Sequence, residues 1–274
     1  MSYQVLVLDL DGTLTNSEKK ISSPTKKGLL EIQQSGKTVV LASGRPINGV
    51  APLSNELCMD RYNGYTLSFN GARITNCSTG EIIYNRTLPP EVIRPVWEYA
   101  GTVPGLDVIT YSDTQILSGI RPNQYDEMES RNSNMEIVLT KDFPSAVSFP
   151  VNKMIISGNP DTVEKVIAPL QKKYDDLLNI YLSEPFYLEI MPKKVDKAYA
   201  LEKLLKHLGL TTESMICCGD GYNDISMIEH AGLGVAMANA QAAVKDAADF
   251  ITRSNDGERK IFCVYGKNSS LIRN

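Results

Sequence analysis

Short apolar runs alternate with amphipathic stretches at the N-terminal end of this 274-residue chain. The wholly apolar run 5–8 stops at Asp9, which is typical of a buried parallel strand that runs into a turn. The amphipathic stretch that follows has Pro24 near its start and Gly36 just past its end, as capped helices do. A second apolar run, 37–42, leads into another helical stretch. The pattern therefore predicts strand, helix, strand, helix.

The same rhythm returns towards the C-terminus. The pattern predicts helices at 197–207, 223–231 and 241–247, and strands at 215–218, 233–237 and 249–252. Asp196 stands where it can cap the first of these helices. Alternating strands and helices at both ends indicate an α/β fold with a doubly wound, mostly parallel sheet.

The middle of the chain has a different pattern. Asn70-Gly71, between two apolar runs, is a strong hairpin signal. Several strand-like pieces and two or three helices follow, with plausible hinges at 88–90 and 191–192. We therefore expect a core formed by 1–83 and 189–274 that is interrupted at 84–188 by an inserted α+β domain, here called the cap.

Composition narrows the functional classes. Twenty-eight Lys and Arg stand against 32 Asp and Glu, a formal charge of −4, which gives no reason to expect nucleic-acid binding. The five cysteines form no Cys-x-x-Cys pair, and there are only two histidines, which argues against a structural zinc site and a disulfide framework. The sequence has neither a signal-peptide pattern nor an apolar run of about 18 residues. We expect a cytoplasmic protein without membrane contact.

Two acidic stretches follow predicted core strands, at the sheet edge where α/β proteins bind ligands. Asp9 and Asp11 stand two residues apart at a sharp turn that Gly12 permits, so one carboxylate can act as a nucleophile while the other transfers protons. Asp220 and Asp224 flank a second glycine turn, and hard carboxylate oxygens suit Mg²⁺. Ordinary turns and helix caps are the alternative explanation for both stretches.

Two further stretches supply groups for an anion. Ser43 and Gly44 end the second strand, where a hydroxyl and free N–H groups can hold an oxyanion, although a plain helix cap is the commoner explanation. Lys197 begins a helix, where a lysine is usually solvated and an anionic partner would favour it. Each signal is weak alone, but four of them at one sheet edge are specific.

These motifs resemble those of the haloacid dehalogenase (HAD) superfamily, and in particular its Cof-type hydrolases, which carry a large α+β cap of the C2B type. The signature Asp-x-Asp-Gly-Thr stands at 9–13, and the strand-ending Ser motif at Ser43. The Lys motif is at Lys197, and the acidic motif Gly-Asp-Gly-Tyr-Asn-Asp is at 219–224. The resemblance covers the core, whereas the cap matches in size and position only.

The resemblance implies a Mg²⁺-dependent phosphomonoesterase acting on small phosphorylated metabolites, with sugar phosphates foremost. Asp9 would attack phosphorus to form an aspartyl-phosphate, and Asp11 would serve as general acid and then base. The Asp9 carboxylate, the Asp11 backbone carbonyl and Asp220 would hold the metal, with Asp224 as a further ligand, direct or through water. The phosphate-binding groups would be Ser43, Gly44, Lys197 and Asn223.

Two other functions remain open on the sequence. A phosphomutase, or another phosphotransferase, would use the same core with a sugar hydroxyl in place of water. A non-enzymatic phospho-acceptor of the receiver type would also have an Asp, a Lys and bound Mg²⁺, but such domains are about half as long and lack the second acid. The expected partner is a small phosphorylated molecule, with no nucleic acid and no membrane, and the chain is expected to be a monomer or small homo-oligomer.

Overall fold

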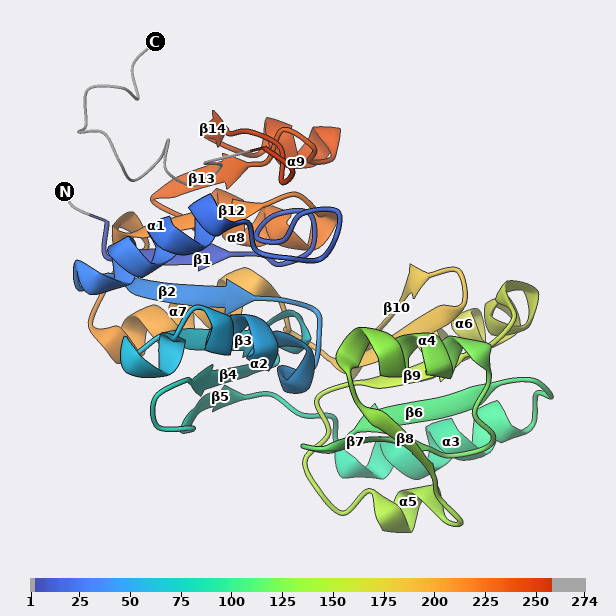
Figure 1. Cartoon of the computed structure of the whole chain (residues 1–274). Helices are drawn as coiled ribbons and strands as arrows, with labels where there is room; N and C mark the ends of the chain where they lie inside the picture. Colours follow the sequence, from blue (N-terminus) through green and yellow to red (C-terminus); the bar gives the residue numbers. More distant parts are fainter. Residues whose placement is uncertain (1–2, 258–274) are drawn as a thin grey trace. The chain divides into compact units, whose positions relative to one another are not determined.

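A computed structural model of the chain describes residues 3–257, which fall into two compact units. The first unit contains the described residues up to Gly44, the segment Val50–Tyr84 and the described residues from Asp196 onward. The second unit contains Arg45–Gly49 and Asn85–Val195. One unit thus interrupts the other in sequence (Figure 1), as in a core with an inserted domain.

The first unit is built on an eight-stranded sheet, counted over the described residues, in the order β14-β13-β12-β1-β2-β3-β4-β5. Its strands are β1 (Val5–Leu8), β2 (Thr38–Ala42), β3 (Tyr65–Ser68), β4 (Arg73–Asn76), β5 (Ile82–Asn85), β12 (Met215–Gly219), β13 (Leu233–Ala236) and β14 (Phe250–Ile251). Neighbours from β14 through β3 pair in parallel, and β3 pairs with β4 antiparallel across the predicted hairpin. The carboxyl ends of the parallel strands therefore share one edge.

Helices cover both faces of this sheet, which is the doubly wound arrangement predicted (Figure 1). They are α1 (Ser23–Gln34), α2 (Ile47–Glu56), α7 (Lys197–Leu208), α8 (Ile225–His230) and α9 (Ala242–Asp246), with 3-10 turns η1 (Met59–Arg61), η2 (Phe69–Gly71), η4 (Thr212–Ser214) and η5 (Tyr222–Asp224). Leu6 and Leu8 of β1 pack with α1 and α2, whereas Val5 and Val7 pack with α7 and α8. Alternate residues of β1 thus enter two hydrophobic clusters because successive side chains of a strand point to opposite faces.

The second unit has a mainly antiparallel six-stranded sheet in the order β10-β11-β9-β6-β7-β8, with β7 and β8 parallel. Its strands are β6 (Asp107–Tyr111), β7 (Gln115–Ser118), β8 (Glu136–Leu139), β9 (Met154–Ser157), β10 (Leu178–Glu184) and β11 (Tyr187–Pro192). Its helices are η3 (Pro90–Val92), α3 (Ile93–Gly101), α4 (Gln124–Ser133), α5 (Phe143–Ala146) and α6 (Pro160–Tyr174). Segregated helices on a mostly antiparallel sheet make this an α+β domain.

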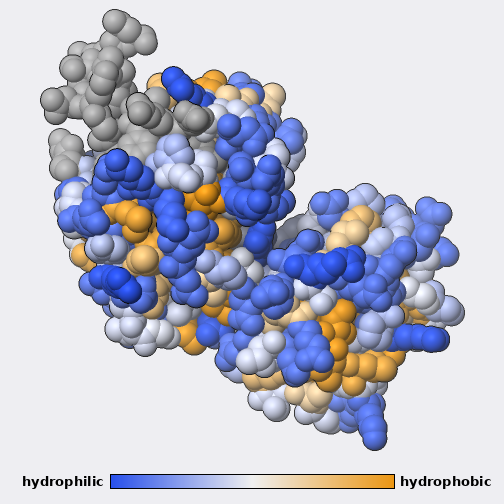
Figure 2. Space-filling model, in the orientation of Figure 1, coloured by the Kyte–Doolittle hydropathy of each residue, from blue (hydrophilic) through white to orange (hydrophobic). Residues whose placement is uncertain are grey.

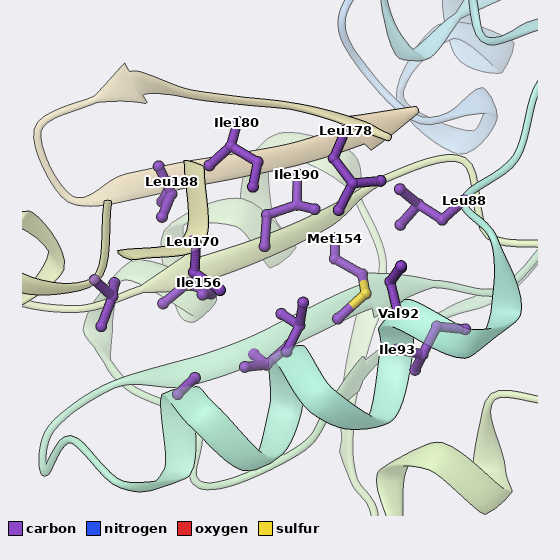
Figure 3. Close-up of a cluster of buried hydrophobic side chains, with 14 of the residues drawn as sticks. Leu88, Val92, Ile93, Met154, Ile156, Leu170, Leu178, Ile180, Leu188 and Ile190 are labelled. Carbon is purple, nitrogen blue, oxygen red and sulfur yellow. The ribbon is translucent and has the colours of Figure 1, made fainter. Parts of the chain in front are cut away.

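One face of the second sheet carries the hydrophobic core of this unit. Met154, Ile156, Leu188 and Ile190 of the central strands pack with residues of α3 and α6, as Figure 3 shows for part of the cluster. The opposite face is more polar. There Lys153 and Glu189, both nearly fully buried, form an ion pair with Nζ 3.1 Å from Oε1.

The strand β11 is the main element that the sequence pattern missed. We expected the core to resume at 189 and a hinge at 191–192, but both positions lie inside β11, which pairs with β9 and β10. Positions 191–192 are therefore strand residues of the second unit, which extends to Val195, and Pro192 is the last residue of β11. Glu189 interrupts the apolar pattern, and it is buried because Lys153 neutralises it.

The surface and the cysteines complete the description. On the face drawn in Figure 2, hydrophilic residues cover most of the surface of both units, with smaller apolar areas between them. Within residues 3–257, we find no helix with the length and apolarity needed to cross a bilayer. Cys58, Cys77, Cys217 and Cys218 are free thiols, and Cys263 lies outside the described residues.

Candidate active site

The carboxyl ends of β1, β2 and β12 bring three of the predicted motifs to one edge of the first sheet. Asp9 follows β1, Ser43 follows β2 and Asp220 follows β12. Because β1 pairs in parallel with both neighbours, the three turns lie side by side. The Asp9 backbone N–H extends the pairing by donating to the Cys218 carbonyl at 3.0 Å. Asp9 therefore stands at the centre of this edge.

Lys197 reaches the same edge from the first turn of α7. Its side chain is fully buried, and its Nζ donates to Asp9 Oδ1 and Asp224 Oδ1, each at 2.6 Å. A third hydrogen bond, 3.0 Å long, goes to the Ala42 carbonyl at the end of β2. The alternative of a solvated surface lysine is therefore wrong, and the ammonium joins segments from three parts of the chain.

The start of α7 is fixed from two sides. The Asp196 side chain caps the helix as predicted, accepting the Tyr199 backbone N–H at 2.9 Å. On the other side, a Cβ at Gly71 would lie 2.5 Å from the Asp196 carbonyl oxygen, and Gly71 has φ +101°. Only glycine fits there, so the Asn70-Gly71 turn packs directly on the backbone that presents Lys197.

Three carboxylates surround this one ammonium, and their pKa values respond to that imbalance. Burial raises the pKa of Asp9 to about 8, and the nearby Asp224 charge adds to the rise, although Lys197 opposes it. Burial likewise raises the pKa of Asp220. Burial alone would lower the pKa of Lys197, but Asp224 and Asp9 outweigh it and raise that pKa. The cluster resists holding all its negative charge at once.

Gly12 and Thr13 fit the first turn tightly against Asp220. Gly12 has φ +83°, and a Cβ there would lie 2.2 Å from Asp220 Oδ2. The Thr13 hydroxyl donates to Asp220 Oδ1 at 2.7 Å. Thr13 was part of the predicted signature but had no assigned role. The structure gives it one, because it orients the Asp220 carboxylate.

Asp224 organises the second acidic turn from within. Its Oδ2 accepts the backbone N–H groups of Asp220 at 3.0 Å and Gly221 at 2.9 Å, while its Oδ1 accepts Lys197. A Cβ at Gly219 would lie 2.5 Å from the Asp224 Cβ, so the turn needs glycine there. Asp224 is fully buried. It therefore caps the turn, as the alternative explanation of this motif predicted, and it also pairs with the charge of Lys197.

The donor set fits a hard divalent cation. Asp9, Asp220 and Asp224 each offer a carboxylate oxygen, and these atoms all lie within 4.8 Å of one another. Three carboxylates and one ammonium leave a formal charge of −2, which one divalent cation would balance. Oxygen-only ligands of this kind suit Mg²⁺. The raised pKa of Asp9 reflects the burial and crowding of these carboxylates, which a bound cation would offset.

Three of the groups predicted to bind phosphate, Ser43, Gly44 and Asn223, meet around Asn70, which the sequence predicted only as part of a hairpin. Asn223 Nδ2 donates to Asn70 Oδ1 at 3.1 Å, and the Asn70 backbone N–H donates to the Ser43 carbonyl at 2.9 Å. A Cβ at Gly44 would lie 3.0 Å from Asn70 Oδ1. The available signal was the position of Asn70 just after β3, a parallel neighbour of β2.

Asp11 is less buried than Asp9 and Asp224. Its side chain is 37% exposed, and its Oδ1 lies 2.8 Å from the Nζ of Lys19, a residue outside the predicted motifs. Asp9 is buried and paired with Lys197, whereas Asp11 is accessible and paired with a second lysine. The two carboxylates of the first motif thus have different environments.

The chain is similar to known proteins over most of its length. Residues 6–258 match the model of the haloacid dehalogenase-like hydrolases. A crystal structure of a haloacid dehalogenase-like hydrolase from Bacteroides thetaiotaomicron is 44% identical, with a TM-score of 0.90 over 93% of this chain and 96% of that one. A Bacillus subtilis 5-amino-6-(5-phospho-D-ribitylamino)uracil phosphatase is 29% identical over 95% of this chain and 94% of its own. The HAD subclass IIB sugar phosphatase BT4131 is 26% identical, with a TM-score of 0.74 over 94% of this chain and 96% of that one.

Proposed function

We propose the following function for this chain, which belongs to the haloacid dehalogenase-like hydrolases and is a phosphatase. The proposed reaction is Mg²⁺-dependent hydrolysis of the phosphomonoesters of small metabolites through an aspartyl-phosphate at Asp9. The observation that carries it is the buried Asp9 carboxylate, held 2.6 Å from Lys197 at the carboxyl edge of a parallel sheet. Family membership sets aside the receiver-type alternative.

Asp9 is the proposed nucleophile. One of its oxygens would bond to phosphorus while the bond from phosphorus to the ester oxygen breaks. The phosphoryl oxygens would be held by Lys197, Ser43, the Gly44 N–H and Asn223. These groups would stabilise the negative charge that spreads over the oxygens in the transition state. Asn70 would orient Asn223, whose amide it accepts. A buried ammonium is effective in this role because the surrounding protein excludes water.

Asp11 is the proposed acid and base. It would give a proton to the departing alcohol oxygen and then take one from the water that attacks the aspartyl-phosphate. Its exposed carboxylate can exchange its proton with solvent between turnovers. Four groups would hold Mg²⁺: the Asp9 carboxylate, the Asp220 carboxylate, the Asp11 backbone carbonyl and, directly or through water, Asp224. When bound, this ion supplies positive charge between nucleophile and phosphate.

Sugar phosphates are the proposed substrates. Two of the relatives support this class: one is named a sugar phosphatase, and the other a phosphatase of a phosphoribityl compound. We propose that the inserted unit selects among such esters and that the core supplies the chemistry, with the chain working in the cytoplasm as a monomer or small homo-oligomer. A phosphomutase on the same core is the second candidate, in which a sugar hydroxyl replaces water as acceptor.

A panel of metabolite phosphates, including hexose phosphates, tests this function. With Mg²⁺ the chain should release orthophosphate, and exhaustive chelation by EDTA should abolish the release. Formation of an isomeric sugar phosphate without orthophosphate would favour the mutase. Full activity after chelation would refute the metal role.

A further inference from the structure

The contact between Lys19 and Asp11 has no place in the mechanism described so far. We propose that Lys19 is a positioning residue, which holds the Asp11 carboxyl group in the orientation needed for proton transfer. The inference rests on the proposed function, because it assigns Lys19 to the same reaction. Lys19 lies in the loop between β1 and α1, and its Nζ is 2.8 Å from Asp11 Oδ1.

The loop is folded so that Lys19 points back to the first motif. Asn16 Oδ1 accepts the backbone N–H groups of Glu18 at 3.1 Å and Lys20 at 2.9 Å. The Asn16 backbone pairs with Lys20 and Lys19 through two more hydrogen bonds, each 2.9 Å long. Lys19 itself has φ +61°, a left-handed conformation that is unfavourable for a residue with a Cβ. Local hydrogen bonds thus hold a backbone geometry that the lysine would not otherwise adopt.

The loop is also attached to a distant part of the same unit. The Ser17 backbone N–H and hydroxyl both donate to Asp256, at 2.8 and 2.7 Å. Asn255 Nδ2 donates to the Thr15 carbonyl at 3.1 Å. Contacts on both sides of Asn16 therefore fix the loop on the segment that follows β14.

A surface ion pair is the simpler explanation, since the side chains of Lys19 and Asp11 are 63% and 37% exposed. Such pairs contribute little to stability. Proton transfer, however, depends on geometry, because the carboxyl oxygen must lie within hydrogen-bond distance of the reacting atom. A hydrogen bond to Oδ1 restricts the rotation of the carboxyl group. The ammonium keeps its own protons while Asp11 donates one to the alkoxide oxygen and later takes one from water.

Lys19→Met and Lys20→Met form a matched pair. Lys20 is the next residue of the loop, and its Nζ pairs with Glu18 Oε2 at 3.1 Å. Lys20→Met therefore removes one positive charge, as Lys19→Met does, but leaves the hydrogen bond to Asp11 in place. The experiment compares kcat/KM for a hexose phosphate with kcat/KM for p-nitrophenyl phosphate, whose leaving group needs little protonation. Urea unfolding of each variant checks that the fold is intact.

We expect Lys19→Met to lower kcat/KM for the hexose phosphate by roughly 10–100-fold, a part of the 10²–10⁴-fold that general acid–base catalysis contributes. The loss with p-nitrophenyl phosphate should be much smaller, Lys19→Arg should recover most of it, and Lys20→Met should match the unmodified chain. Equal losses with both esters, or equal losses in both Met variants, would overturn the inference alone. Inactivity of the unmodified chain with both esters would overturn the proposed function, and this inference with it.

Discussion

Among single residues, Lys197 carries the strongest electrostatic role, because it is the buried cation between Asp9 and Asp224. Lys197→Ala should lower kcat/KM sharply, since the phosphoryl group loses its ammonium partner. It should also destabilise the fold by about 3–5 kcal/mol at pH 9, above the raised pKa of Asp9, which is the usual cost of leaving buried charge unpaired. At pH 5 the cost should be smaller, because Asp9, with a pKa of about 8, already carries a proton there.

Urea unfolding at both pH values and steady-state kinetics measure these effects. A helix N-terminus tolerates alanine, so α7 itself should form. An unchanged kcat/KM in a folded Lys197→Ala variant would remove Lys197 from the phosphate site.

Gly12 offers a second test at this scale, with a control elsewhere in the unit. Gly12→Ala would place a Cβ 2.2 Å from Asp220 Oδ2, so it should displace that carboxylate and weaken Mg²⁺ binding. Gly36 has nearly the same φ, +81°, but a Cβ added at Gly36 would have no atom within 4 Å. Gly36→Ala should therefore cost only the backbone penalty, about 1–2 kcal/mol, and retain activity. Calorimetric Mg²⁺ titration should separate the two variants, and equal affinities would contradict the assignment of Asp220.

At the scale of elements, the sequence predicted the strands and helices of the core better than it predicted the long-range contacts between side chains. Apolar runs and glycine stops predicted β1, β2, β12 and α7, because burial of a parallel sheet dictates those patterns. The pattern could not predict β11, where Glu189 is buried only because Lys153 arrives from another strand. Nor could it assign Asn70 or Lys19 to the site, because both act through long-range or loop geometry that periodicity does not encode.

The helix α4 carries a titratable group that should affect the stability of the second unit. Asp126 is fully buried near the start of α4, and burial raises its pKa to about 7, although hydrogen bonds from Ser157 and Asn123 oppose the rise and Asp107 adds to it. The folded state therefore keeps a proton that the unfolded state releases above about pH 4. Stability should fall as pH rises from about 4 to 7, by at most about 1.4 kcal/mol per pH unit.

Asp126→Asn should flatten this dependence, because an amide does not titrate. The difference in unfolding free energy between the variant and the unmodified chain, followed from pH 4 to 8, isolates Asp126 from Asp9. A difference that does not change with pH would show that Asp126 has an ordinary pKa in the folded protein.

At the scale of the whole molecule, one chain combines two units with separate hydrophobic cores. The first supplies every residue of the proposed chemistry, and the second interrupts it between β5 and α7. The sequence motifs therefore predict the reaction of the core, whereas substrate choice, which we assign to the second unit, has no comparable motif.

The central claim is that Asp9 becomes phosphorylated and that Asp11 moves the protons. The most direct test uses Asp11→Asn with ³²P-labelled p-nitrophenyl phosphate in a rapid-quench experiment, since this ester needs little help from an acid in the first step. Label should accumulate on the peptide that contains Asp9 and be released by hydroxylamine, because the second step lacks its base. Asp9→Asn should take up no label. Steady release of phosphate by Asp11→Asn with no labelled Asp9 at any time would contradict the account.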